Sequence, residues 1–163
     1  MNWGAEDFVA AGLILGSVFT AFWLAWRRST RIAYLMAFAA GLGAAFLLVW
    51  VSLAVGIIGE PGHAANLVFA AVILAAVAGA AWSRLEPGRL SRAMWVTACV
   101  QAAAGVFAVI VTARTPGAPG VWLVAGFNAG LAAVFAFSAW LFRVEDGLQR
   151  AAKQAFDGGS RAY

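Results

Sequence analysis

The sequence predicts an all-α integral membrane protein, a bundle of five transmembrane helices with the N-terminus outside and the C-terminus in the cytoplasm. Three observations predict this fold. The 163 residues are 64% hydrophobic and only 11% charged, a composition that excludes a soluble domain of ordinary surface. Long stretches lack charge altogether, and the basic residues gather in alternate connections between these stretches.

The predicted spans are five runs that contain no Asp, Glu, Lys or Arg, at about 8–26, 32–59, 64–83, 93–113 and 118–142. A hydrocarbon core of about 30 Å requires about 20 apolar residues in a helix, because backbone polar groups in lipid must pair within the segment. Each run is long enough to cross. Residues 1–142 are therefore predicted to form one bundle, and residues 143–163 a cytoplasmic tail.

The first run could instead be a secretory signal peptide. However, the residues before it are acidic, with Glu6 and Asp7, whereas a signal peptide begins with a basic region. The run ends in Trp26-Arg27-Arg28 without a small-residue cleavage site. It is predicted to remain in the membrane as the first span.

The orientation follows from the basic residues of the connections. Of the 11 Lys and Arg residues, only Arg114 lies on one side of the predicted membrane. The others lie on the opposite side: Arg27, Arg28, Arg31, Arg84, Arg89, Arg92, Arg143, Arg150, Lys153 and Arg161. Because Lys and Arg are retained in the cytoplasm, this second side is predicted to be cytoplasmic.

The tail after the fifth span has apolar residues at helical spacing, namely Val144, Leu148, Ala151, Ala152, Ala155 and Phe156, with basic residues among them. This pattern predicts a short amphipathic cytoplasmic helix near anionic headgroups, or an extension of the fifth span.

Two hairpins of the chain resemble each other. Arg31-Ile-Ala-Tyr34 at the second span corresponds to Arg92-Ala-Met-Trp95 at the fourth, 61 positions later. The segment beginning at Asn66 in the third span corresponds to the one beginning at Asn128 in the fifth, 62 positions later. Alanine-rich helices also align by chance, so duplication is one of two interpretations. A true repeat would relate the hairpins by an axis along the membrane normal.

Helices in lipid associate where small residues allow close backbone approach. The clearest such pairs are Gly12 with Gly16 in the first span and Gly126 with Gly130 in the fifth. We expect these glycines to pack helices within one chain; the alternative is a dimer interface.

Few side chains could carry chemistry. The candidate ligand-binding residues are Trp50, Ser52, His63, Asn66, Gln101 and Asn128, most of them in the outer half of the predicted spans. If the hairpins pack together, these groups could line one polar pocket that opens outward. The alternative is that each amide only joins helices, through a hydrogen bond worth about 0.6–2 kcal/mol.

Other chemistries are disfavoured. His63 is the only histidine, so two histidine ligands to one haem are excluded, and a zinc site lacks ligands. Neither Ser52 nor the single cysteine, Cys99, has a base beside it in the membrane. The sequence thus predicts no enzyme, cofactor or metal site, and the basic residues flank membrane spans instead of forming a nucleic-acid surface.

The stretch Leu53-Ala-Val-Gly-Ile-Ile-Gly59, followed by Ala65-Asn66-Leu67, resembles a family of small, uncharacterised five-span proteins of the bacterial inner membrane. The acidic N-terminus after Met-Asn-Trp, the run Phe46–Trp50 and the Arg-rich loops share this resemblance, which covers nearly all of the chain. This chain departs from the family in the turn Pro61-Gly-His-Ala64. The resemblance implies a bacterial cytoplasmic membrane location and no particular activity.

Two functions are compatible with these observations. The first is a non-catalytic accessory or structural subunit of a larger or homo-oligomeric membrane assembly. The second is a binding or carrier protein for a lipid-like or small amphipathic ligand in an outer-leaflet pocket.

Overall fold

The computed structural model describes residues 5–54, 57–58, 64–115 and 120–159, and within these ranges it is helical. The helices are α1 (Ala5–Arg28), α2 (Ile32–Ala54), α3 (Val68–Ser83), α4 (Pro87–Thr112) and α5 (Val121–Gly159), and a short 3-10 helix, η1 (Ala64–Leu67), leads into α3. The predicted all-α fold is confirmed.

Four segments are long and apolar enough to cross a membrane: Ile32–Ala54, Ala64–Ser83, Pro87–Thr112 and Val121–Asp157. They correspond to the second to fifth predicted spans. The first predicted span lies in α1, a helix of 24 residues, and its crossing of a membrane remains a prediction.

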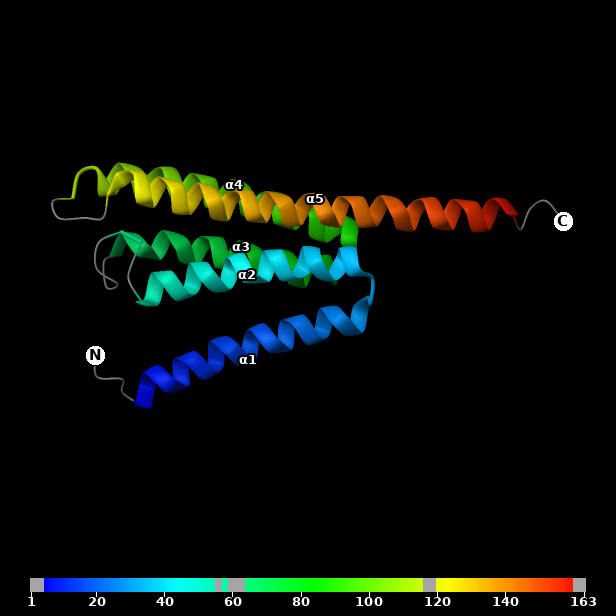
Figure 1. Ribbon diagram of the computed structural model, residues 1–163, viewed down its shortest axis with the longest axis horizontal. Coiled ribbons are helices and arrows are strands. Elements are labelled where there is room, and N and C mark those ends of the chain that lie inside the picture. The colour runs from blue at the N-terminus through cyan, green and yellow to red at the C-terminus, as the bar shows by residue number, and fades with distance from the viewer. Residues whose placement is uncertain (1–4, 55–56, 59–63, 116–119, 160–163) are drawn as a thin grey trace.

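The helices α2 to α5 form a bundle in which each hairpin packs against the other (Figure 1). The most extensive contact joins α4 and α5, followed by α2 with α5 and α3 with α4, while α2 and α3 touch only slightly. Helix α1 packs mainly on α2 and diverges from the bundle toward its beginning (Figure 1). Among the α1 side chains that the structure describes, only Ala25 is fully buried.

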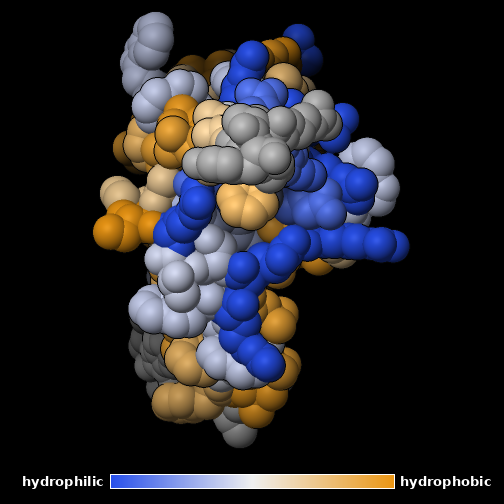
Figure 2. Space-filling view, turned by 90° about the vertical axis from the view of Figure 1, so that its right-hand side faces the viewer, coloured by the Kyte–Doolittle hydropathy of each residue, from blue (hydrophilic) through white to orange (hydrophobic). Residues whose placement is uncertain are grey.

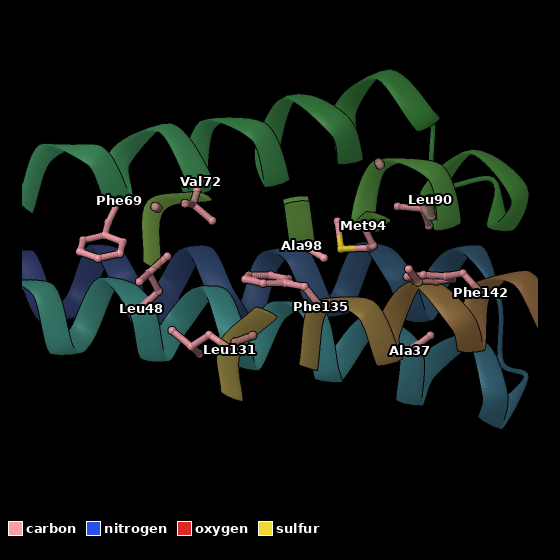
Figure 3. Packing of buried hydrophobic residues seen from close by; sticks show 14 of the residues in the cluster. Ala37, Leu48, Phe69, Val72, Leu90, Met94, Ala98, Leu131, Phe135 and Phe142 are labelled. Atoms are coloured by element: carbon pink, nitrogen blue, oxygen red, sulfur yellow. The ribbon is translucent and has the colours of Figure 1, made fainter. Parts of the chain in front are cut away.

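Large apolar side chains fill the space between the hairpins (Figure 3). Phe135 of α5 lies beside Ala98 and Met94 of α4, and Phe142 of α5 lies near Leu90 of α4. Leu48 of α2 lies near Phe69 of α3, and all of these residues are buried. Dispersion contacts of such side chains are the main cohesion available in lipid, where there is little hydrophobic driving force between helices.

Glycines allow the closest helix approaches, but these glycines are not members of the two clearest predicted pairs. A Cβ atom added at Gly79 would lie 2.7 Å from Ala93 Cβ, and one at Gly105 would lie 2.8 Å from Asn128 Cβ. By contrast, a Cβ at any member of the two predicted pairs, Gly12 and Gly16 or Gly126 and Gly130, would meet no atom of the described residues within 4 Å. The prediction that these four pack helices within one chain is wrong, because they lie on open faces.

The tail is not a separate helix. Residues 143–159 continue α5, which has 39 residues and extends well beyond the other helices (Figure 1). At about 1.5 Å per residue α5 is about 58 Å long, nearly twice the hydrocarbon thickness. The prediction of a short amphipathic helix lying on the membrane surface is replaced by its alternative, an extension of the last span.

Candidate functional site

Helices α4 and α5 are joined by a pair of buried amides. Gln101 Nε2 donates to Asn128 Oδ1 at 2.8 Å, and Asn128 Nδ2 donates to the carbonyl of Val124 at 2.8 Å. The absence of a side chain at Gly105 makes room for Asn128 against α4. Gln101 Oε1 is buried without a partner among the described residues. The pair therefore has the helix-bridging role that the sequence analysis gave as the alternative to ligand binding.

Asn66 uses its amide differently. Its Oδ1 accepts a hydrogen bond from the backbone N–H of Ile58 at 2.9 Å, and its Nδ2 donates toward the Ile58 carbonyl at 3.4 Å. These bonds hold η1 to the connection that follows α2. Asn66 thus serves the backbone of its own hairpin, whereas Asn128 reaches a side chain on the neighbouring helix.

An open groove lies between α2 and α3, where these helices are only loosely packed. Its volume is about 730 Å³. It is lined by Leu48, Val49, Ser52, Leu53, Ala64, Asn66, Leu67, Phe69, Ala70, Ile73 and Leu74. Apart from Ser52 and Asn66, these side chains are hydrocarbon, so the groove suits an apolar molecule with few polar groups.

A second groove, of about 350 Å³, lies between α4 and α5. Its lining residues Val109 and Ile110 follow Leu48 and Val49 of the first groove by 61 positions. Its residues Asn128, Ala129 and Ala132 follow Asn66, Leu67 and Ala70 by 62 positions. These are the same offsets that relate the two hairpins in sequence. The two grooves therefore occupy equivalent positions, as a duplicated hairpin requires.

The single pocket predicted from the sequence is divided between these two grooves. Ser52 and Asn66 line one, Asn128 lines the other, and Gln101 is bonded to Asn128. Trp50 lines neither groove; it is 40% exposed and stacks on Phe46 with ring centroids 5.9 Å apart. The amides do not meet because each finds a nearer partner in its own hairpin. His63 lies outside the described residues.

A polar cluster that the sequence did not predict lies at the opposite end of the bundle. Glu145 of α5 is 1% exposed, and its Oε1 accepts from Arg31 Nη1 at 3.1 Å and from Gln149 Nε2 at 2.9 Å. The hydroxyl of Tyr34, which is also buried, donates to the Leu85 carbonyl at 3.0 Å. Glu145 lies in the segment 143–163, which was predicted to be a cytoplasmic tail. Its position three residues after Phe142 places both side chains on the same face of the helix, and this spacing was the signal for its burial.

Two hydrogen bonds of Leu85 hold the connection between α3 and α4 in a backbone conformation that residues other than glycine rarely adopt. Arg84 and Leu85 have φ of 49° and 60°, in the left-handed region. The backbone N–H of Leu85 donates to Ser83 Oγ at 3.1 Å, and its carbonyl accepts from Tyr34. The surrounding contacts therefore stabilise a backbone conformation that costs on the order of 1 kcal/mol per residue. The cluster joins α2, α5 and this connection, which is a structural role.

Within the described part of the chain, no group of three or more His, Cys, Asp or Glu side chains could hold a metal ion. Comparisons with protein-family models, with curated proteins and with solved structures find no match to this chain. Any function must therefore be inferred from the geometry itself.

Proposed function

We propose that this protein is a non-catalytic subunit of the bacterial cytoplasmic membrane that assembles with a second copy of itself through α5. The proposal includes five spans, with α1 as the first, the N-terminus outside and the C-terminus in the cytoplasm. The orientation is supported by the positions of the basic residues. Figure 2 shows hydrophilic side chains gathered at the end from which α5 projects, the end of the bundle that carries Arg28, Arg31 and Arg89.

The observation that carries the proposal is an apolar seam on the part of α5 that leaves the bundle. Leu141, Val144, Leu148, Ala151 and Ala155 follow one another at alternating spacings of three and four residues. From Val144 onward these residues are exposed, Val144 by 39% and Leu148 by 54%. Such spacing is the pattern by which two helices pack as a coiled coil.

Lipid does not account for this exposure. The seam is flanked by Arg143, Asp146, Arg150 and Lys153, and the helix at this level continues away from the bundle (Figure 1). Exposed aliphatic side chains among such charges lie in water, where burial against another helix is favourable. A copy of the same protein inserts in the same orientation, so its α5 would be parallel and in register.

The seam also continues into the membrane. Phe137, Val134 and Gly130 extend the same alternation toward the start of α5, and all three are exposed within one chain. The α5 helix of a parallel partner would thus contact Gly130 within the membrane, and the aliphatic residues from Val144 onward in water. This arrangement gives the open glycine a role as part of a dimer interface, the alternative raised in the sequence analysis.

Disulfide crosslinking in membranes tests the proposal. In a Cys99→Ser background, we expect Leu148→Cys and Ala151→Cys to form disulfides between copies, because both lie on the seam. Arg150→Cys and Lys153→Cys are matched controls on the same exposed stretch of helix, turned away from the seam, and should remain monomeric on non-reducing gels. Equal crosslinking at all four positions, or none at any, would contradict assembly through this face.

A further inference from the structure

The α2–α3 groove has the length of one lipid leaflet. Its lining runs along η1 and α3 from Ala64 to Leu74, which corresponds to about 15 Å at 1.5 Å per residue. This is half of a hydrocarbon core of about 30 Å. The groove begins at the end of α2 that lies away from Arg31 and ends near the middle of α3. It therefore matches a single hydrocarbon chain of the leaflet opposite the basic connections.

One polar atom in the groove lacks a partner. Hydroxyls within helices usually donate to a backbone carbonyl three or four residues earlier, and Ser17, Thr20 and Thr97 do so here at 2.7, 2.7 and 3.0 Å. Ser52 Oγ is buried and makes no hydrogen bond within the described part of the chain. A buried hydroxyl without a partner is costly, so a bound molecule with an acceptor at this point would be favoured.

The equivalent groove between α4 and α5 is smaller, and its lining contains no unpaired hydroxyl. It is about half as large, and Ala113 stands where the repeat places the counterpart of Ser52. Its asparagine is engaged by Gln101, whereas Ala40 occupies the corresponding position in α2. The α2–α3 groove is thus a specific departure from its own repeat and not a general consequence of loose helix packing.

We propose that the α2–α3 groove binds one acyl chain of an ester lipid, with Ser52 Oγ donating to the ester carbonyl. The carbonyl is an acceptor at the boundary between hydrocarbon and headgroups, and Ser52 lies two residues before the end of α2, near that boundary. The chain below the carbonyl then contacts Val49, Phe69 and Ile73 along the groove. This site is independent of assembly through α5.

Photocrosslinking of the full chain in phosphatidylcholine vesicles tests the site. The vesicles contain a trace of phosphatidylcholine with a diazirine on one acyl chain, and mass spectrometry locates the adducts after irradiation. We expect adducts to concentrate on the groove residues of α2 and α3. Ala70→Trp should fill the groove and lower these adducts about tenfold. The matched control is Ala132→Trp, at the equivalent position of the α4–α5 groove, which should leave them unchanged.

A second filling variant, Leu67→Trp with its control Ala129→Trp, covers the case in which Ala70→Trp does not fold. Leu67 is 73% exposed and therefore tolerates a larger side chain. Adducts spread evenly over the lipid-facing surface, or unchanged by a filling variant that folds, would overturn the proposal.

Competition separates an ester lipid from any other alkyl chain. Vesicles whose bulk lipid is ether-linked phosphatidylcholine should give about threefold to tenfold more labelling of the groove than vesicles of the ester-linked lipid, because the ether lacks the carbonyl that Ser52 binds and competes less with the labelled ester. Ser52→Ala should abolish this difference. Ser17→Ala should preserve it, since Ser17 donates to the Ile14 carbonyl. Equal labelling of the wild type in the two kinds of vesicle would overturn recognition of the ester.

Discussion

The two hairpins, α2–α3 and α4–α5, have groove-lining residues at matching sequence offsets of 61 and 62 positions and yet pack differently. One leaves a groove of about 730 Å³ between its helices, and the other leaves about 350 Å³. In α4, Gln101 and Gly105 meet Asn128 of α5. The corresponding positions of α2 hold Ala40 and Ala44. The α4–α5 hairpin therefore packs more closely than the α2–α3 hairpin for two reasons. The amide of Gln101 bonds to the neighbouring helix, and Gly105 leaves room for that helix to approach.

The comparison shows that the two hairpins of one bundle can differ in how tightly their helices pack. The α4–α5 hairpin is the rigid half of the protein, and the α2–α3 hairpin is the adaptable half. Close approach and an interhelical hydrogen bond stabilise α4 against α5 without any hydrophobic driving force in lipid. The α2–α3 hairpin gains its contacts mainly from the facing hairpin, through Leu48, Phe69 and Phe135 (Figure 3). The three predictions below separate these contributions.

The largest effect is expected from Gly105→Leu. A Cβ atom alone would lie 2.8 Å from Asn128 Cβ, so a leucine must push α4 and α5 apart and break the amide pair. We expect a loss of about 3 kcal/mol or more in the free energy of unfolding, at the upper end of overpacking costs. Thermal unfolding in a mild detergent measures it.

The control for this variant is Gly43→Leu. A Cβ at Gly43 would meet nothing within 4 Å, so the same substitution in α2 should change stability little. Equal destabilisation by the two substitutions would mean that helix propensity or membrane insertion, and not the contact with Asn128, determines the effect.

An intermediate effect is expected from Gln101→Leu. The substitution leaves Asn128 Oδ1 buried without its donor, at a cost of about 1–2 kcal/mol. Adding Asn128→Leu removes the unpaired group, so the double variant should be more stable than the sum of the two single losses predicts. A double-mutant cycle from unfolding measurements gives the coupling energy, and strictly additive losses would contradict a direct bond between the two amides.

The positions of the helices in the chain could be predicted from the sequence, but the side of each helix that contacts a neighbour could not. Runs without charge predict spans because lipid admits only paired backbone and apolar side chains, a constraint that each segment carries by itself. Which side of a helix meets a neighbour depends on the other helices. The spacing of Gly126 and Gly130 therefore predicted close packing on a face that is open within one chain, while Gly79 and Gly105 make the close contacts among the described residues.

The candidate site was predictable to the level of residue type and depth. Asn66 and Asn128 each line a groove, at positions 62 residues apart in the chain. The depth of a residue in the membrane does not determine the direction in which its side chain points around the helix. The shared depth of these residues therefore did not imply a shared pocket. The bond between Glu145 and Arg31 was also beyond the sequence, because the two residues are 114 positions apart.

The smallest effect is expected from Asn66→Leu. Asn66 bonds to the backbone of Ile58 near the end of the bundle, and these bonds are only partly buried, so water or headgroups can replace them. We expect a loss of less than about 1 kcal/mol in the free energy of unfolding, against about 1–2 kcal/mol for the matched variant Asn128→Leu. The same two substitutions at equivalent positions thus report how far the hairpins have diverged. If Asn66→Leu is as damaging as Asn128→Leu, the connection held by Asn66 contributes as much to stability as the interhelical amide pair, and the α2–α3 hairpin is not the adaptable half of the protein.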